Sequence, residues 1–406
     1  MKQLPSLIFN QFLSITAGRF LEFFVPWMIL ADTHVPALAT AAMAVIPLSS
    51  ALLILPLGQW VGRGSFTYLP RLSQLIQGTS FLFLALLMHT GLSVANLLWA
   101  IFGTVIVYAQ AASVLNLTLS PQLRVVFGRD QMIHLSNYRE GVDAIVTLMA
   151  PIAAGIIYSH WHPIGGVFAV GILYAIAAWS LTGIAHVYKR QWVPLEPHTQ
   201  IKDVGAFHTI LHYPLRTLVI VEWVANFITV GVELDLILFM AHTLHLSPIQ
   251  AGTVFSVAGA GDLLAVFALG RWQKSPRFHP ERALIYAFAV LVLGALVLLM
   301  AGNCWNIAVG LFVLDGGLAA VFVLESGIRN MIVPVDRMIK VNSGLTFSAY
   351  LVRTLASVLP GLAFSLADGR VFLGMTMAGV FITMGLLYAH RGQLQHVVQL
   401  NRDSSC

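Results

Sequence analysis

The sequence predicts an all-α integral membrane protein with twelve transmembrane helices. The first observation behind this prediction is composition: 58% of the 406 residues are hydrophobic and only 10% are charged. Soluble domains carry about 25% charged residues, so this chain cannot cover its surface with charge. The second observation is that apolar runs of about 20 residues, the length that crosses a bilayer, recur along the whole chain. We therefore expect the protein to be embedded in a lipid bilayer.

Each of the twelve predicted spans is a separate apolar run. They lie at 6–30, 38–61, 73–91, 94–117, 139–159, 164–187, 215–241, 248–270, 283–301, 305–328, 342–366 and 370–390. The first run is too long for a signal-peptide core and carries Arg19 and Glu22, so we expect a span rather than a cleaved leader.

The lysines and arginines predict the orientation of the spans. Of the 22 lysines and arginines, 19 fall on one side of the predicted membrane, and Arg370 alone falls on the other. Arg19 and Arg353 lie inside spans. Because cytoplasmic loops are rich in lysine and arginine, both termini are expected in the cytoplasm. The basic residues are spread over short loops rather than gathered in one patch, so the net charge of +5 does not indicate a nucleic-acid partner.

The longest polar stretch lies mid-chain and divides the spans into two groups of six. We expect an N-terminal six-helix bundle at 1–188, a cytoplasmic linker at 189–213, a C-terminal six-helix bundle at 214–391 and a cytoplasmic tail at 392–406. The segment Asp130–Ile133 before the fifth span is echoed by Asp336–Ile339 before the eleventh. This echo favours two pseudo-symmetric halves that arose by duplication.

Two short motifs carry a family resemblance. The loop after the second span runs from Gly58 to Arg63, with a glycine and an arginine placed as in a gating loop, although Gly62 stands where an aspartate is typical. The fifth span contains Pro151 and Gly155, a proline that bends a helix and a small residue that lets helices approach. In these features the chain resembles the major facilitator superfamily of transporters. The resemblance implies alternating access between two six-helix halves.

Other segments resemble one branch of that superfamily, the enterobactin exporters and macrolide-efflux proteins. These are His212–Leu215, Leu246–Gly252 and Asp336–Asn342. The likeness implies export of a small organic molecule, a siderophore or a drug, through the bacterial inner membrane, with protons as the expected coupling ion. We expect a monomer without a cofactor.

A second resemblance, to ferroportin-type iron exporters, rests on Arg139, Asp143, Pro151 and Gly155 together with Gly58–Val61. It implies divalent metal export as the alternative function. The acid and histidine that such exporters use in their first span are matched here only by Glu22, and the cysteine and histidine of their later spans are missing. No metal site is therefore expected.

Ionisable and strongly polar side chains within spans are the candidate site residues, because each costs a few kcal/mol to place in lipid unless it faces a cavity or a partner. We take Glu22, Glu222 or Glu233 as the proton-coupling carboxylate. The alternative is that these side chains only pair helices, for example with Arg353. The candidates are Arg19, Glu22, Asp143, Glu222, Asn226, Glu233, Asp235, Asp315 and Arg353. Glu325 and Arg329, four residues apart, are expected to form a surface pair.

Histidines cluster at the predicted outer span ends: His34, His89, His160, His162, His242 and His245. A metal-collecting rim and neutral polar capping are both open interpretations. No phosphate-binding glycine loop and no catalytic cluster at one membrane face are visible, so an enzyme is not expected. A non-transporting sensor is the remaining alternative, and it is disfavoured by intramembrane charges in both halves.

Overall fold

The computed structural model describes residues 4–61, 68–127, 132–184, 215–273, 275, 278–332, 335–366, 374 and 376–389. The regular secondary structure of this described part is entirely helical. Ten segments in it are long and apolar enough to cross a membrane. These findings agree with the predicted all-α membrane class, while the number twelve and the orientation of the termini stay predictions.

The chain divides into two compact units. The first comprises Met1–His198 and Ala241–Ser256, and the second comprises Thr199–Met240 and Val257–Cys406. Each unit is described below by itself.

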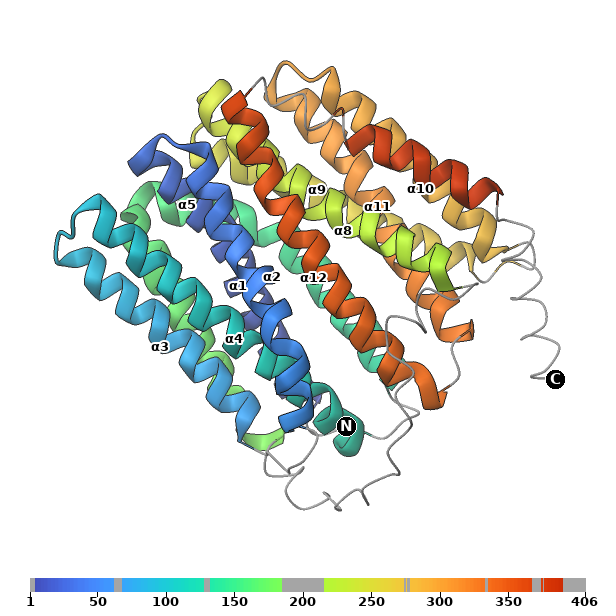
Figure 1. The fold of residues 1–406 in the computed structure, drawn as a ribbon, viewed down its shortest axis with the longest axis horizontal. Helices are drawn as coiled ribbons and strands as arrows, with labels where there is room; N and C mark the ends of the chain where they lie inside the picture. The colour runs from blue at the N-terminus through green and yellow to red at the C-terminus, as the bar shows by residue number, and fades with distance from the viewer. Residues whose placement is uncertain are drawn as a thin grey trace. The chain divides into compact units, whose positions relative to one another are not determined.

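The described part of the first unit contains five long helical elements, one of them kinked. They are α1 (Leu4–Thr33), α2 (Pro36–Val61), α3 (Leu69–His89), α4 (Val94–Phe127) and α5 (Met132–Ser180). α1 packs against α5 and α2, and α3 packs against α4 and α5 (Figure 1). Segments far apart in sequence are thus brought side by side around one apolar core.

α5 is two helices joined at a kink. The backbone leaves helical geometry at Trp161 and His162, where His162 has a φ of 55°, and Pro163 follows directly. Proline starts a helix well but cannot continue one, so the second half begins where the first stops. The two parts match the predicted spans 139–159 and 164–187 in position.

The second unit is built from α8 (Leu215–Leu238), α10 (Pro280–Leu299), α11 (Cys304–Ile332), α12 (Val335–Leu366) and a shorter apolar helix at Thr376–Ala389. α8 ends in the π-helical turn η2 (Phe239–Thr243). α9 (Pro248–Trp272) gives its residues up to Ser256 to the first unit and the rest to the second. Within the second unit, α8 packs against α11 and α12, and α10 packs against α11.

Helix ends differ most from the predicted span ends in three places. α4 continues to Phe127, ten residues past the predicted end. α5 begins at Met132 and α12 at Val335, each seven residues before the predicted start. Hydropathy finds the apolar part of a helix, whereas polar residues beyond it can remain helical.

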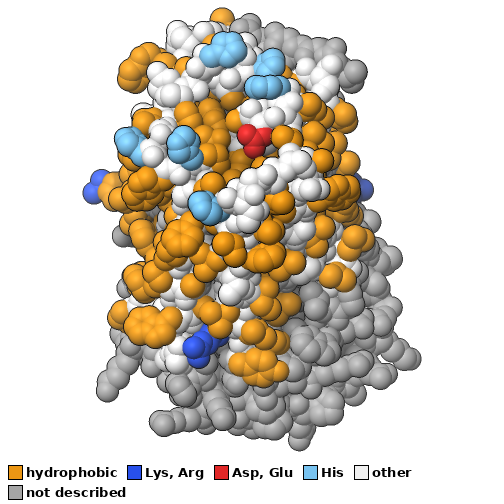
Figure 2. All heavy atoms as spheres, turned by 90° about the vertical axis from the view of Figure 1, so that its left-hand side faces the viewer, with side chains coloured by type: hydrophobic (Ala, Val, Ile, Leu, Met, Phe, Trp, Pro, Cys, Tyr) orange, Lys and Arg blue, Asp and Glu red, His pale blue; other side chains and the backbone are white. Residues whose placement is uncertain are grey.

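Large apolar side chains cover much of the outside of the described residues. Trp99, Trp179 and Met300 expose 77%, 70% and 82% of their surface. Figure 2 shows hydrophobic side chains spread over most of the described part of one face, with histidines gathered toward one end. Apolar exposure on this scale fits lipid and not water.

Candidate functional site

The second unit holds a buried carboxylate–guanidinium–carboxylate cluster. Arg329 Nη1 on α11 lies 3.0 Å from Glu222 Oε2 on α8 and 3.3 Å from Glu325 Oε1 one turn earlier on α11. The three side chains expose 16%, 15% and 4% of their surface. Two carboxylates therefore share one cation in surroundings that exclude most water.

The net charge of this cluster determines how it can bind a proton. With both carboxylates ionised the group carries one net negative charge, which is costly in an apolar interior. Uptake of one proton neutralises it, and loss of that proton leaves the second carboxylate still paired with Arg329. The cluster is thus suited to bind and release one proton while its helices stay joined.

A second polar pair extends the cluster along α8. Asn226 accepts a hydrogen bond of 2.6 Å from Nε of Arg353 on α12, and its amide donates a 2.8 Å bond to the backbone carbonyl of Glu222. Asn226 is 3% exposed. α8 therefore links the charges of α11 to those of α12 through residues one turn apart.

Apolar packing beside this cluster fixes the helices that carry it. Val219 on α8 packs with Val341 and Leu345 on α12, and Trp223 lies against them. The indole N–H of Trp223 donates a 2.9 Å hydrogen bond to Ser348 Oγ. The same helix pair that brings Arg353 to Asn226 is thus held by an apolar contact and a polar one.

The first unit holds a separate ion pair on α1. Arg19 Nη1 lies 3.2 Å from Glu22 Oε2, and the side chains are 25% and 43% exposed. Beside it, the hydroxyl of Tyr174 on α5 donates a 3.3 Å bond to that of Tyr108 on α4. A methyl group built on Gly18 would lie 3.8 Å from the Tyr174 hydroxyl, which places the tyrosine pair against α1 next to Arg19.

Aromatic rings line the same helix beyond Glu22. Phe23 stacks on Trp27 with ring centres 5.5 Å apart, and Phe24 stacks on Tyr158 of α5 at 6.1 Å. All three residues of α1 are buried. Charge, two hydroxyls and aromatic surface are together the features that bind amphipathic organic molecules.

The bent helix α5 makes a backbone contact with the start of α9 inside the first unit. A methyl group on Gly155 would lie 2.9 Å from the carbonyl carbon of Pro248, and one on Gly252 would lie 2.9 Å from that of Pro151. Only glycine fits at these two positions without moving a helix. The predicted helix-approach role of Gly155 therefore has a defined partner.

A buried amide network ties α1 to α3 and α5. Asn10 Nδ2 donates to Gln74 Oε1 at 2.9 Å and to the carbonyl of Ala177 at 2.7 Å, and Gln74 Nε2 donates to Ser14 Oγ at 2.7 Å. Asn10 and Gln74 are fully buried. Sequence reasoning missed this network because it considered only ionisable groups and Asn226.

The structure places the other predicted site residues as follows. Asp143 on α5 and Asp315 on α11 are half-buried, as is Glu233 on α8, and Asp235 on α8 is 1% exposed. Gly58 falls within α2, and Arg63 lies outside the described residues.

One sequence-based interpretation is corrected. The expected surface pair of Glu325 and Arg329 exists but is largely buried, and Arg329 is also the partner of Glu222. The alternative that span glutamates pair helices fits Glu222, which binds Arg329 of α11 and also interacts electrostatically with Arg353 of α12, while Arg353 Nε donates to Asn226. Arg329 lies on the side of α11 that packs against α8, so its side chain points into the unit.

Three of the histidines predicted at outer span ends terminate or bend helices. His34, His162 and His245 have positive φ angles of 54°, 55° and 50°. Such left-handed positions occur where a helix ends and the chain turns. Within the described part of the chain, no group of three or more histidine, cysteine, aspartate or glutamate residues could hold a metal ion.

The fold is similar to that of solved membrane transporters. A bacterial homologue of the iron transporter ferroportin in the inward-facing state has a TM-score of 0.74 at 14% identity, with 96% of this chain and 98% of that chain covered. The POT family transporter PepTSo has a TM-score of 0.74 at 11% identity, with 97% and 98% covered. The nucleoside transporter NupG has a TM-score of 0.71 at 12% identity, with 96% and 99% covered.

These similarities show that the chain shares the fold of these transporters. At such low identities they concern the fold alone. No protein-family model and no curated protein matches the sequence.

Proposed function

We propose that this protein is a proton-coupled secondary transporter that moves a small organic molecule across a membrane by alternating access. The observation that carries the proposal is the cluster of Glu222, Glu325 and Arg329, in which one arginine serves two buried carboxylates. A fold shared with transporters for chemically different substrates supports transport as the activity.

The cluster supplies a physical mechanism for coupling. The state with two ionised carboxylates is unfavourable in an apolar interior, so a proton is retained whenever water is excluded. Opening to water lowers that cost and releases the proton. A substrate that binds one of these two states more tightly than the other shifts the equilibrium between them. Substrate binding is thereby linked to proton binding.

The first unit offers the groups that would contact the substrate. Arg19 and Glu22 provide both signs of charge, Tyr108 and Tyr174 provide hydroxyls, and the rings that follow on α1 provide apolar surface. This combination suits an amphipathic organic molecule, such as a siderophore or a macrolide, better than a bare cation.

Export is the proposed direction, on the strength of the resemblance of the Pro151–Gly155 segment to exporters. We also keep as proposals the twelve-span topology, cytoplasmic termini, the two six-helix bundles with their predicted bounds, the bacterial inner membrane as location and a monomeric state. Divalent metal export is the second candidate, because the ferroportin homologue matches over nearly the whole chain.

Transport by purified protein in proteoliposomes tests the proposal. Vesicles are loaded with a siderophore, a macrolide or Mn²⁺, and efflux is followed with and without an imposed pH gradient. We expect efflux of an organic molecule that the gradient accelerates. Efflux of Mn²⁺ alone would replace the main proposal with the second candidate, and organic efflux insensitive to the gradient would refute proton coupling.

A further inference from the structure

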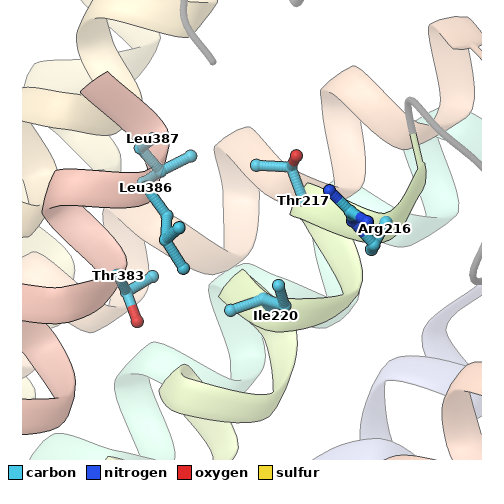
Figure 3. Close-up of a pocket in the computed structure, with 6 residues that line it drawn as sticks. All are labelled: Arg216, Thr217, Ile220, Thr383, Leu386 and Leu387. Carbon is cyan, nitrogen blue, oxygen red and sulfur yellow. The ribbon is translucent and has the colours of Figure 1, made fainter. Parts of the chain in front are cut away.

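A cavity of about 360 Å³ lies in the second unit, and Glu222, Glu325 and Arg329 are not among its described lining residues. It is formed by the first turns of α8 and the last helix, Thr376–Ala389. Figure 3 shows the two sets of side chains facing each other from these helices. The cavity is lined by Arg216, Thr217, Ile220, Thr383, Leu386 and Leu387. Its volume falls within the usual range of small-molecule sites.

One wall of this cavity attracts anions. Arg216 is exposed, lines the cavity and forms no ion pair with the carboxylates of the described residues. It lies in the first described turn of α8. A negatively charged group is therefore favoured at this end.

A buried hydroxyl adds a polar contact beside the arginine. Thr217 is 6% exposed and lines the cavity. A threonine hydroxyl both donates and accepts hydrogen bonds. An oxygen of a ligand bound in the cavity would accept a hydrogen bond from it.

Apolar side chains from both helices complete the lining, and on the last helix they reach the outside of the unit. Ile220 lies on α8 and Leu387 on the last helix, and Leu386 is 36% exposed. Tyr388, at the end of the same helix, is 57% exposed. Tyrosines near span ends typically mark the headgroup level of a bilayer. The site thus has a cationic end at the membrane interface and an apolar side toward lipid.

We propose that this cavity binds an anionic phospholipid, with the phosphodiester on Arg216 and Thr217 and the first part of an acyl chain on Ile220, Leu386 and Leu387. A free phosphate would leave the apolar wall uncovered, and a zwitterionic lipid would bring its own cation next to Arg216. The site predicts selectivity for phosphatidylglycerol over phosphatidylcholine. The inference does not depend on the proposed transport activity.

Native mass spectrometry of the full-length protein in detergent tests this site. The protein is titrated with dioleoylphosphatidylglycerol or dioleoylphosphatidylcholine, and with inorganic phosphate in a third arm. We expect the wild type to bind at least one phosphatidylglycerol. The control Arg282→Gln, which removes an exposed arginine of α10 outside the cavity, should bind it equally well. Arg216→Gln should weaken that binding about ten-fold and Thr217→Val about three-fold, while Arg216→Lys should retain most of it.

Three results would overturn the proposal. They are equal binding of both lipids, equal losses in Arg216→Gln and Arg282→Gln, and binding of inorganic phosphate at the strength of phosphatidylglycerol. Circular dichroism confirms that each variant is folded. If Arg216→Gln does not fold, the comparison of Arg216→Lys with the wild type still tests the site.

Discussion

Gly155 of α5 and Pro248 of α9 are in contact through their backbones, and the contact is reciprocal, since Gly252 of α9 lies in the same way against Pro151 of α5. Both glycines end a five-residue segment of nearly the same sequence: Pro-Ile-Ala-Ala-Gly in α5 and Pro-Ile-Gln-Ala-Gly in α9. Each proline carbonyl faces the glycine of the other segment. Two copies of one short motif thus form a symmetric pair within the first unit.

Alanine at either glycine should separate these two helices. A methyl group at Gly155 or Gly252 would overlap backbone atoms that cannot move aside by rotating a side chain. We expect each substitution to destabilise the protein by about 1–3 kcal/mol, and the double variant to cost less than the sum because one separation relieves both overlaps. Thermal unfolding in detergent measures these effects.

Matched controls exist on the same two helices. Gly141 on α5 and Gly270 on α9 have open space where a methyl group would be placed. Alanine there should be neutral or stabilising by up to about 1 kcal/mol, because glycine is a poor helix former. Equal effects of alanine at Gly155 and Gly141 would contradict the close contact.

Removal of Arg329 should be more harmful than removal of either of its carboxylates. Arg329→Met leaves Glu222 and Glu325 buried without their cation, which costs about 3–5 kcal/mol of folding free energy. Glu222→Gln leaves the Glu325–Arg329 pair intact and should cost less. Unfolding at pH 7 compares these variants. The double variant Arg329→Met/Glu222→Gln should recover part of the loss, and no recovery would argue against a shared cluster.

Asn226 should be needed as an acceptor for Arg353. Asn226→Leu removes the acceptor of the 2.6 Å bond and leaves a half-buried guanidinium N–H without it, at a cost of about 1–3 kcal/mol. Asn226→Asp retains an acceptor and should be closer to wild type in thermal unfolding. The exposed Asn306 of α11 provides a control, since its replacement by leucine should change stability by less than about 0.5 kcal/mol.

The sequence predicted the helices better than the contacts between them. Apolar runs located each described helix, because lipid requires long apolar segments whatever their packing. The partner of Glu222 could not be predicted in this way: Arg329 lies 107 residues away, and helix rotation decides whether an arginine near a span end points to water or inward. The repeated Pro-Ile-x-Ala-Gly segments were a visible signal for the α5–α9 contact that span counting did not use.

The amide network on α1 predicts a non-additive pair of substitutions. Asn10→Leu leaves Gln74 Oε1 and the Ala177 carbonyl without the bonds that Asn10 donates, at a cost of about 1–3 kcal/mol. The double variant Asn10→Leu/Gln74→Leu removes two polar partners together, so it should cost less than the sum of the single variants when unfolding is followed by heat. Additive costs would show that the two amides act independently. Thr79→Val, at a partly exposed hydroxyl bonded only within its own helix, serves as control.

Proton release on substrate addition tests the coupling proposal most directly. Purified protein in weakly buffered detergent solution is mixed with the organic substrate identified by efflux, and the pH change is recorded. The proteins compared are the wild type, Glu222→Gln, Glu325→Gln and the control Glu281→Gln. Glu281 is a buried carboxylate of α10 outside the cluster. We predict about one proton released per substrate by the wild type and Glu281→Gln, and little release by the two cluster variants. Undiminished release by both cluster variants would contradict the assignment of coupling to Glu222, Glu325 and Arg329.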